Sequence, residues 1–359
     1  MSTETDTEAK EQEEEEETFE YGGGELVFNS IIRTDVKRDD PEGLRDQILD
    51  QLPDFEQGDP GQQGSGSIEL NLEEFAEEEN VQFDLREVAD DILGIEYRYE
   101  EYPNEPIEAV EYRDGEPRYV DAFPRKTRSV FLYWDYPKTI FVQGAQTRVD
   151  DVAPTVNSSL KNKVSFTYHD FDEEFLLWLV LKDKHSEDLS TGLEIVELNS
   201  TEITGGDPAD FGRDAEVDDS DDISQSLPIL AGILKDMDVA MLEGDFAIGK
   251  HRVNAKIFGD GRVRLYANRD LGPSTKLERA LISIKFLTEI MEEYRSWEDL
   301  PTEEKYPHPR YFEDLHNEAN DMGANFDFDF TPLVHRYADL RGEDPNSYNL
   351  DFEIYEPDE

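Results

Sequence analysis

The chain has 359 residues and a formal net charge of −54, with 88 Asp and Glu residues against 34 Lys and Arg. It contains no cysteine, which excludes disulfides, thiolate metal sites and a cysteine nucleophile. Aromatic residues make up 11% of the sequence, which predicts packed cores and excludes a wholly disordered acidic chain.

Changes in composition along the chain predict an α+β fold with two mixed α/β domains. The first 24 residues are rich in Glu and end in three glycines, which predicts a disordered acidic tail. The segments in chain order are the tail (1–24), an N-terminal mixed α+β domain (25–204), an acidic loop rich in Asp and Gly (205–222), an α-β-β-β-α domain (223–297) and a C-terminal extension (298–359).

In the N-terminal domain, apolar periodicity distinguishes strands from helices. The expected strands are 129–134, 139–142, 164–168 and 193–198. A short apolar run covers 26–32, strand-like alternation starts at 68–72, and hairpin-like runs lie between 95 and 123. The expected helices are 41–52, 146–160 and a helix that follows Asp170 and ends near His185. That last helix is apolar on all sides between Phe175 and Leu181, which predicts deep burial. Asp170 is expected to cap it.

The C-terminal domain is predicted to be a helix, a three-stranded antiparallel sheet and a second helix. Its expected elements are a helix near 223–236, strands at 239–248, 250–258 and 262–268, and a helix at 275–297. The C-terminal extension is expected to hold a helix near 309–322 together with extended acidic segments.

The charge imbalance predicts where the protein works. At molar salt the Debye length falls to about 3 Å, so repulsion among the carboxylates is largely screened. We therefore expect a protein of an extreme halophile. A cytoplasmic location is expected because the N-terminus lacks the pattern of a signal peptide, and no membrane contact is expected because no apolar run is long enough to span a bilayer. A DNA mimic is the rival interpretation, and total charge alone does not separate the two.

Two motif matches are expected to be coincidental. The run from Gly244 to Lys250 has the spacing of a phosphate loop, but His251 replaces the Ser or Thr that binds magnesium, and the residues after it alternate like a strand. Glu313 and His316 form a single E-x-x-H, whereas a di-iron bundle needs two. We therefore expect no metal and no cofactor, and the sequence identifies no catalytic residue.

One window departs from the acidic background. Residues 249–285 hold nine basic residues and three acids, a net charge of +6 in a chain of net charge −54. A three-residue turn at 259–261 would pair Lys256 with Arg264 and place Gly261 in the left-handed position of a bulged hairpin. The side chains expected on one face, as an anion- or partner-binding site, are Lys250, Arg252, Lys256, Arg262, Arg264 and Tyr266.

Two interpretations of this basic hairpin stay open. In the first, carboxylates elsewhere in the chain form ion pairs with the cations of the hairpin and neutralise its charge. Alternatively, the face binds an anionic partner by direct contacts, for which Arg is suited.

The element order of 223–297 resembles type III secretion chaperone-like domains, on the apolar run from Leu230 to Leu234, the strands through Gly244 and Gly249, and the apolar helix from Leu277 to Trp297. The resemblance implies a non-catalytic, often dimeric domain that binds protein segments. We therefore expect a binding or adaptor protein that engages a protein partner or self-associates through its C-terminal domain. A nucleic-acid-associated protein using the hairpin 249–269 is one alternative. A hydrolase or transferase with an unrecognised site is another.

Overall fold

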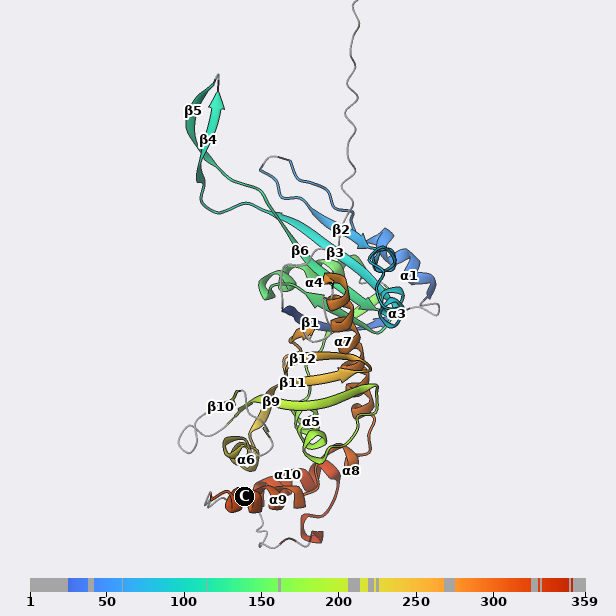
Figure 1. Cartoon of the computed structure of the whole chain (residues 1–359), viewed down its shortest axis with the longest axis vertical. Helices are drawn as coiled ribbons and strands as arrows, with labels where there is room; N and C mark the ends of the chain where they lie inside the picture. Colours follow the sequence, from blue (N-terminus) through green and yellow to red (C-terminus); the bar gives the residue numbers. More distant parts are fainter. Residues whose placement is uncertain are drawn as a thin grey trace, which may run out of the picture.

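A computed structural model shows an elongated α+β molecule (Figure 1). The residues that the structure describes are 25–37, 42–59, 61–113, 115–160, 163–205, 214–218, 223, 226–267, 275–323, 329, 331–348 and 350. The predicted tail, much of the predicted acidic loop and the last nine residues lie outside them.

The strands cover much of the chain between residues 26 and 267. They are β1 (Leu26–Val36), β2 (Ser65–Leu70), β3 (Ile92–Glu101), β4 (Ile107–Arg113), β5 (Glu116–Ala122), β6 (Lys126–Asp135), β7 (Thr139–Gln143), β8 (Val164–Tyr168), β9 (Leu193–Thr204), β10 (Asp214–Val217), β11 (Asp238–Ile248), β12 (His251–Phe258) and β13 (Val263–Ala267). The helices are α1 (Glu42–Ile48), α2 (Leu72–Glu78), α3 (Phe83–Asp91), α4 (Gln146–Leu160), α5 (Glu173–His185), α6 (Leu227–Leu234), α7 (Lys276–Glu298), α8 (Thr302–Lys305), α9 (Arg310–Asp321) and α10 (Thr331–Arg341).

A single antiparallel sheet forms the frame of the molecule. Its strand order is β10-β9-β11-β12-β13-β1-β7-β6-β3-β2, and β8 pairs with β1 outside this path. The N-terminal strand β1 lies between β13 and β7, so it joins strands from the two predicted domains. The boundary between those domains stays a prediction, but the strands on either side of it share one sheet.

Apolar side chains line one face of this sheet and part of the other, and α7 packs against the first. Thr275 and Glu278 form a capping box at the start of α7, which satisfies backbone donors that the helix leaves free. The helix buries Leu281, Ile284 and Leu287 in the larger core, together with apolar residues of α3, α5, α6 and the sheet. Because α5 is buried on nearly all sides, the expectation of deep burial is confirmed.

The opposite face of the sheet carries a second core. There α1 and α4 cover β1, β3, β6 and β7, with Ile32, Ile140 and Val142 among the buried residues. A bulge between Phe28 and Ser30 lets Phe28 and Ile31 both face the larger core while Ile32 faces the second one. Among the described residues, the second core holds none from β12 or β13, and the side chains on that side of these two strands are half-buried or exposed.

Three details of the predicted elements were wrong. The strand-like alternation at 68–72 continues as a strand only to Leu70, because Asn71 accepts a hydrogen bond from the Glu74 amide and begins α2. The cap of α5 is Asp172, which accepts from the Glu174 amide at 2.9 Å, and not Asp170. Residues after 322 were expected to be extended, but Thr331–Arg341 is a helix.

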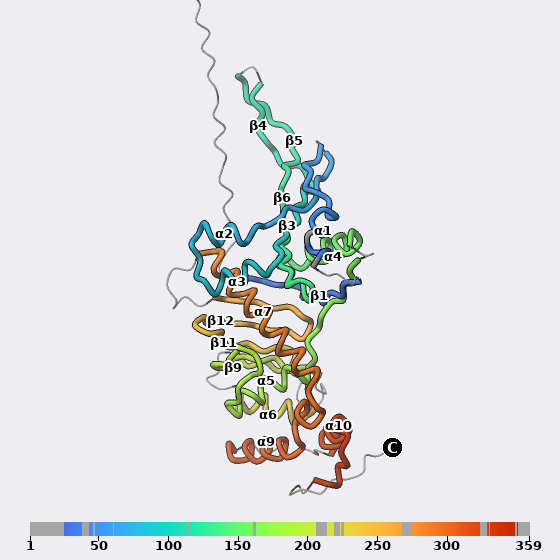
Figure 2. Tube along the Cα trace, turned by 90° about the vertical axis from the view of Figure 1, so that its right-hand side faces the viewer, coloured from blue at the N-terminus to red at the C-terminus, as the bar shows by residue number. Residues whose placement is uncertain are grey.

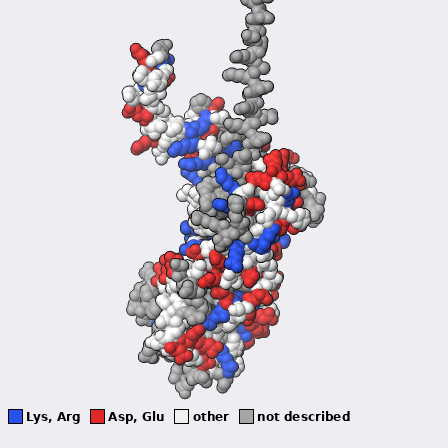
Figure 3. Space-filling view, viewed as in Figure 1, with Lys and Arg blue, Asp and Glu red and all other residues white. Residues whose placement is uncertain are grey.

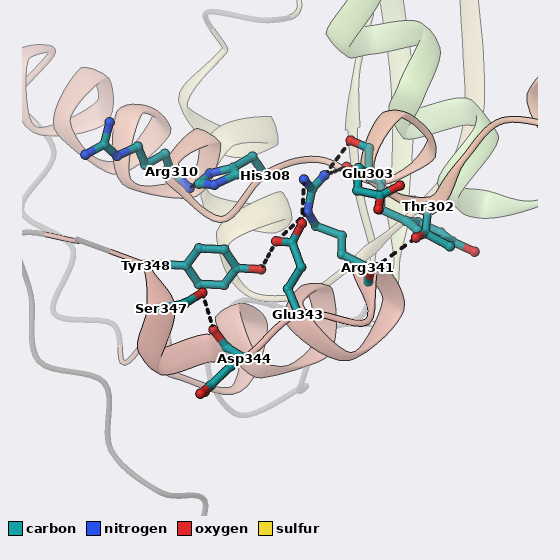
Figure 4. A network of polar contacts seen from close by, with 10 residues as sticks. Thr302, Glu303, His308, Arg310, Arg341, Glu343, Asp344, Ser347 and Tyr348 are labelled. Atoms are coloured by element: carbon teal, nitrogen blue, oxygen red, sulfur yellow. Dashed lines mark hydrogen bonds and ion pairs between the residues drawn. The ribbon is translucent and has the colours of Figure 1, made fainter.

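The C-terminal helices are held by buried polar contacts (Figure 4). Arg341 is buried, donates to the carbonyl oxygens of Glu303 and Tyr306 at 2.7 and 2.6 Å, and pairs with Glu343 at 3.2 Å. Since these contacts satisfy the guanidinium on several sides, the end of α10 is fixed against the segment around α8.

No helix in the described part of the chain is long and apolar enough to cross a membrane.

A buried carboxylate joins α5 to α10. The hydroxyl of Tyr337 donates to Glu174 at 2.9 Å, and Arg336 Nη2 lies 2.8 Å from Glu174 Oε1. Burial raises the pKa of Glu174 to about 7, and Tyr337 and Arg336 oppose this only in part. The folded protein therefore keeps this proton at pH values where the unfolded chain has lost it.

This pKa predicts a pH-dependent stability difference between the wild type and Glu174→Gln. The contribution of Glu174 is complete below about pH 4.5 and is lost as the pH rises through about 7. Between these values we expect the wild type to lose stability relative to the variant, by at most about 1.4 kcal/mol per pH unit. Paired unfolding curves across this range measure the difference. Glu77→Gln, on the exposed side of α2, is the control; parallel curves for Glu174→Gln would refute the prediction.

Candidate functional site

The hairpin of β12 and β13 has the predicted register. Lys256 lies opposite Arg264, and Asn254 lies opposite Tyr266. The amide of Gly261 donates to the carbonyl oxygen of Phe258 at 3.0 Å, and Gly261 has a φ of +78°. The three-residue turn and its left-handed glycine, both expected from the sequence, are therefore confirmed.

The two faces of this hairpin differ sharply. The inward side chains are buried in the larger core, and they are Val253, Ala255, Ile257, Val263 and Leu265. We define the basic sheet face as the outward side chains of the same two strands and their turn. They are Arg252, Asn254, Lys256, Phe258, Arg262, Arg264 and Tyr266. Tyr266 is 47% exposed.

Carboxylates of the chain neutralise three of the predicted cations. Lys250 Nζ lies 2.8 Å from Asp84 Oδ1. Lys256 Nζ lies 3.3 Å from Glu243 Oε2, on the neighbouring strand β11. Arg262 Nε lies 2.7 Å from Asp260 Oδ2 within the turn.

The remaining two arginines are exposed. Arg252 and Arg264 form no ion pair with a carboxylate of the described residues. Internal neutralisation therefore accounts for part of the predicted site, and Arg252, Arg264 and Tyr266 form its uncovered part.

The ring of Phe258 contacts three cations of the basic sheet face. The guanidinium of Arg262 lies 4.5 Å from the centroid of the Phe258 ring, Arg264 lies at 5.6 Å and the ammonium of Lys256 at 5.9 Å. Cations over a ring face are attracted by its quadrupole, so Phe258 offsets part of their mutual repulsion. Sequence reasoning did not identify Phe258, although its position two residues after Lys256 on the same strand placed it on this face.

Lys250 belongs to a different contact. His251 Nε2 and Lys250 Nζ both approach the carboxylate of Asp84, which lies in α3, at 2.6 and 2.8 Å. Burial alone would raise the pKa of Asp84, but hydrogen bonds from these two residues lower it to about 2. We therefore assign Lys250 to the attachment of β12 to α3. No sequence signal indicated Asp84, which is 166 positions away from Lys250.

Acidic residues border the basic sheet face along β11. Asp245 lies opposite Asn254 and accepts a hydrogen bond from its amide at 3.1 Å, and Glu243 lies opposite Lys256. The surface of the molecule mixes the two charges in the same way over short distances (Figure 3). The face therefore presents cations, one exposed aromatic ring and carboxylates side by side.

The two motif matches have structural explanations. The run from Gly244 to Lys250 is the end of β11 and a tight turn into β12, with Gly249 at a φ of +58°, and a strand rather than a helix comes after it. Glu313 and His316 lie on α9, where the His316 ring contacts the amide of Asn320. Among the described residues no cluster of three His, Asp or Glu side chains has a geometry that could hold a metal ion.

A second candidate site is a cleft beside Trp178. Two adjoining cavities of about 380 and 220 Å³ share Trp178, Lys182, Glu187 and Glu304 as lining residues. Lys182 already pairs with Glu187 at 2.7 Å and lies 5.1 Å from the centroid of the Trp178 ring.

The buried acid of this cleft is fully engaged. Glu293 accepts hydrogen bonds from the Ser190 hydroxyl at 2.8 Å and from the amides of Ser190 and Thr191 at 3.1 and 3.0 Å. These contacts attach the segment before β9, which holds Ser190 and Thr191, to α7, which holds Glu293.

No protein-family model matches this chain, and no curated protein matches its sequence. Its function is therefore inferred from the geometry and the charges of the two candidate sites.

Proposed function

We propose that this is a non-catalytic binding or adaptor protein whose basic sheet face takes an acidic segment of a protein. The observation that carries the proposal is the uncovered set of Arg252, Arg264 and Tyr266 on the outward side of β12 and β13. Arginine with an exposed aromatic ring is the combination enriched at protein interfaces. The likeness of 223–297 to type III secretion chaperone-like domains, which bind protein segments, is part of the same proposal.

The carboxylates beside the face favour a protein over nucleic acid. A phosphate backbone carries a negative charge on every nucleotide, and it would meet Glu243 and Asp245 next to the arginines. A protein segment can place acids opposite Arg252 and Arg264 and neutral or basic groups elsewhere. A nucleic-acid-associated protein is therefore the second candidate, and a hydrolase or transferase that uses the cleft beside Trp178 is the third.

The setting that we propose is the salt-rich cytoplasm of an extreme halophile. At molar salt, attraction over long distances is screened. Direct contacts to arginine, together with the apolar area of Tyr266, then supply the affinity, and this suits a small face with few uncovered charges.

The test is binding of fluorescently labelled probes in about 2 M KCl, where the Debye length is only a few Å. The probes are an acidic, tyrosine-containing peptide, a single-stranded DNA and a duplex DNA. We expect the peptide to bind and Arg252→Gln with Arg264→Gln to weaken it at least tenfold. Since neither arginine is ion-paired within the described residues, the melting temperature should change little.

The matched control is Lys276→Gln with Lys285→Gln, which removes the same charge from α7 on the other side of the sheet. It should leave peptide binding unchanged. Equal loss in both double variants would show a general charge effect and refute the proposed face. Tighter binding of DNA than of the peptide, lost in the arginine variant, would favour the second candidate.

A further inference from the structure

We call the hairpin of β4 and β5 the arm, and this arm exposes apolar side chains. Strands β4 and β5 form a separate two-stranded sheet that extends away from the body (Figures 1 and 2). A two-stranded hairpin alone is at best marginally stable in water. Its tyrosines Tyr112 and Tyr119 are each 73% exposed, and Ile107 and Val110 are about half exposed.

The base of this arm is firmly attached. Arg125 pairs with the buried Glu100 at 3.1 Å, donates to the Gly58 carbonyl oxygen at 2.8 Å and to the Tyr102 hydroxyl at 3.0 Å. These contacts brace the chain where it leaves the main sheet. The arm is therefore a supported projection with a defined base.

The two faces of the arm have different charges. On one face Glu111 lies opposite Arg118, and Arg113 lies opposite Glu116, so the charges balance. We define the acidic arm face as the opposite face of the β4–β5 hairpin. Its cross-strand pairs are Glu108 with Asp121, Val110 with Tyr119, and Tyr112 with Pro117. All six of these residues are exposed, and none is basic.

The acidic arm face and the basic sheet face match in two neighbouring rows. On the arm, a pair of acids lies next to a row with an exposed tyrosine, Tyr119. On the sheet, the pair of Lys256 and Arg264 lies next to a row with an exposed tyrosine, Tyr266. Rows on one face of a strand succeed one another every second residue in both hairpins. Like charges directly opposite one another are unfavourable in a hairpin. On the sheet, Glu243 and the Phe258 ring offset part of this repulsion, and contact between the two faces would relieve the remainder there and the repulsion between the arm acids.

We propose that the arm of one chain docks its acidic face on the basic sheet face of a second copy, and that the second copy does the same in return. The arm leaves the body from β3 and β6 and points away from β12 (Figure 1), so a second chain supplies the contact. A twofold exchange of this kind repeats the contact and closes the assembly as a dimer. The inference rests on the proposed function and names the acidic segment that the face binds.

Two charge-reversal variants and their mixture test this exchange. The first is Glu108→Arg with Asp121→Arg on the arm, and the second is Lys256→Glu with Arg264→Glu on the sheet. Light scattering after size exclusion in molar KCl measures the mass of each sample. We expect twice the chain mass of 41.4 kDa for the wild type and the single mass for each variant alone.

Mixing the two variants should restore the dimer. In the mixture both contacts become complementary, because the acidic arm of one variant meets the basic face of the other, and the reversed arm meets the reversed face. This recovery also shows that both variants are folded. Glu73→Arg with Glu77→Arg, on exposed positions of α2, is the charge-matched control and should remain dimeric. A second arm variant, Tyr112→Ser with Tyr119→Ser, should lower the affinity of self-association at least tenfold.

A wild-type protein that elutes at the mass of one chain would overturn the exchange. So would an arm-reversed variant that stays dimeric, or a mixture of folded variants that does not assemble. The binding of the acidic peptide separates this result from failure of the proposed function. If the protein is monomeric but still binds the peptide through Arg252 and Arg264, the proposed binding face stands and only the proposal that a second copy occupies it is refuted.

Discussion

Transfer from molar salt to about 50 mM KCl is expected to abolish the cooperative unfolding transition of this protein. The Debye length then rises above about 10 Å, so that carboxylates on neighbouring elements repel each other across the surface. A net charge of −54 on 359 residues makes this repulsion large relative to the free energy of unfolding of an ordinary domain, about 5–15 kcal/mol. Acidic side chains lie on the body, on the arm and on the C-terminal helices (Figure 3).

Circular dichroism during stepwise dialysis measures this effect. A parallel series with a neutral osmolyte at the same osmolality is the control, because osmolytes strengthen burial without screening charge. We expect salt to preserve the transition and the osmolyte to preserve it less. A cooperative melt that persists at about 50 mM salt would contradict both the charge argument and the proposed halophilic setting.

The second large effect is expected for Gly261→Ala, in the turn of the basic hairpin. A Cβ atom at this position would lie 1.9 Å from the backbone oxygen of His169, and the φ of +78° already disfavours any residue with a side chain. The neighbouring segment has little freedom to move. The His169 amide donates to the Ile31 carbonyl oxygen at 2.9 Å, and the Phe171 amide donates to the Gly259 carbonyl oxygen at 2.8 Å.

We expect Gly261→Ala to cost more than about 4 kcal/mol of unfolding free energy, because the new Cβ atom would force one of two well-bonded backbone segments to shift. The matched control is Gly249→Ala in the preceding hairpin turn. Gly249 also has a positive φ, +58°, but a Cβ atom there meets nothing within 4 Å. Gly249→Ala should therefore lower the free energy of unfolding only by the penalty for a left-handed backbone conformation, about 1–2 kcal/mol. Denaturant unfolding in molar salt measures both, and equal losses would show that contact with His169 has no effect.

Local features of the fold could be predicted from the sequence. The all-apolar run from Phe175 to Leu181 predicted the buried helix α5, and the alternation after Lys250 predicted which side chains of β12 and β13 face outward. The glycine spacing predicted the register of Lys256 with Arg264. These properties depend on neighbours within a few residues, where side-chain period and turn geometry leave few alternatives.

The sequence by itself determined the acidic background, the position of the basic hairpin and the face on which its cations lie. Only the tertiary structure decided that β1 lies between β13 and β7, that Asp84 engages Lys250, and that Arg252 and Arg264 form no ion pair within the described residues. With 88 carboxylates in the chain, no local pattern selects the few that come to lie beside a given cation. That selection depends on pairings between segments far apart in sequence, which arise from the packing of the whole sheet and its helices.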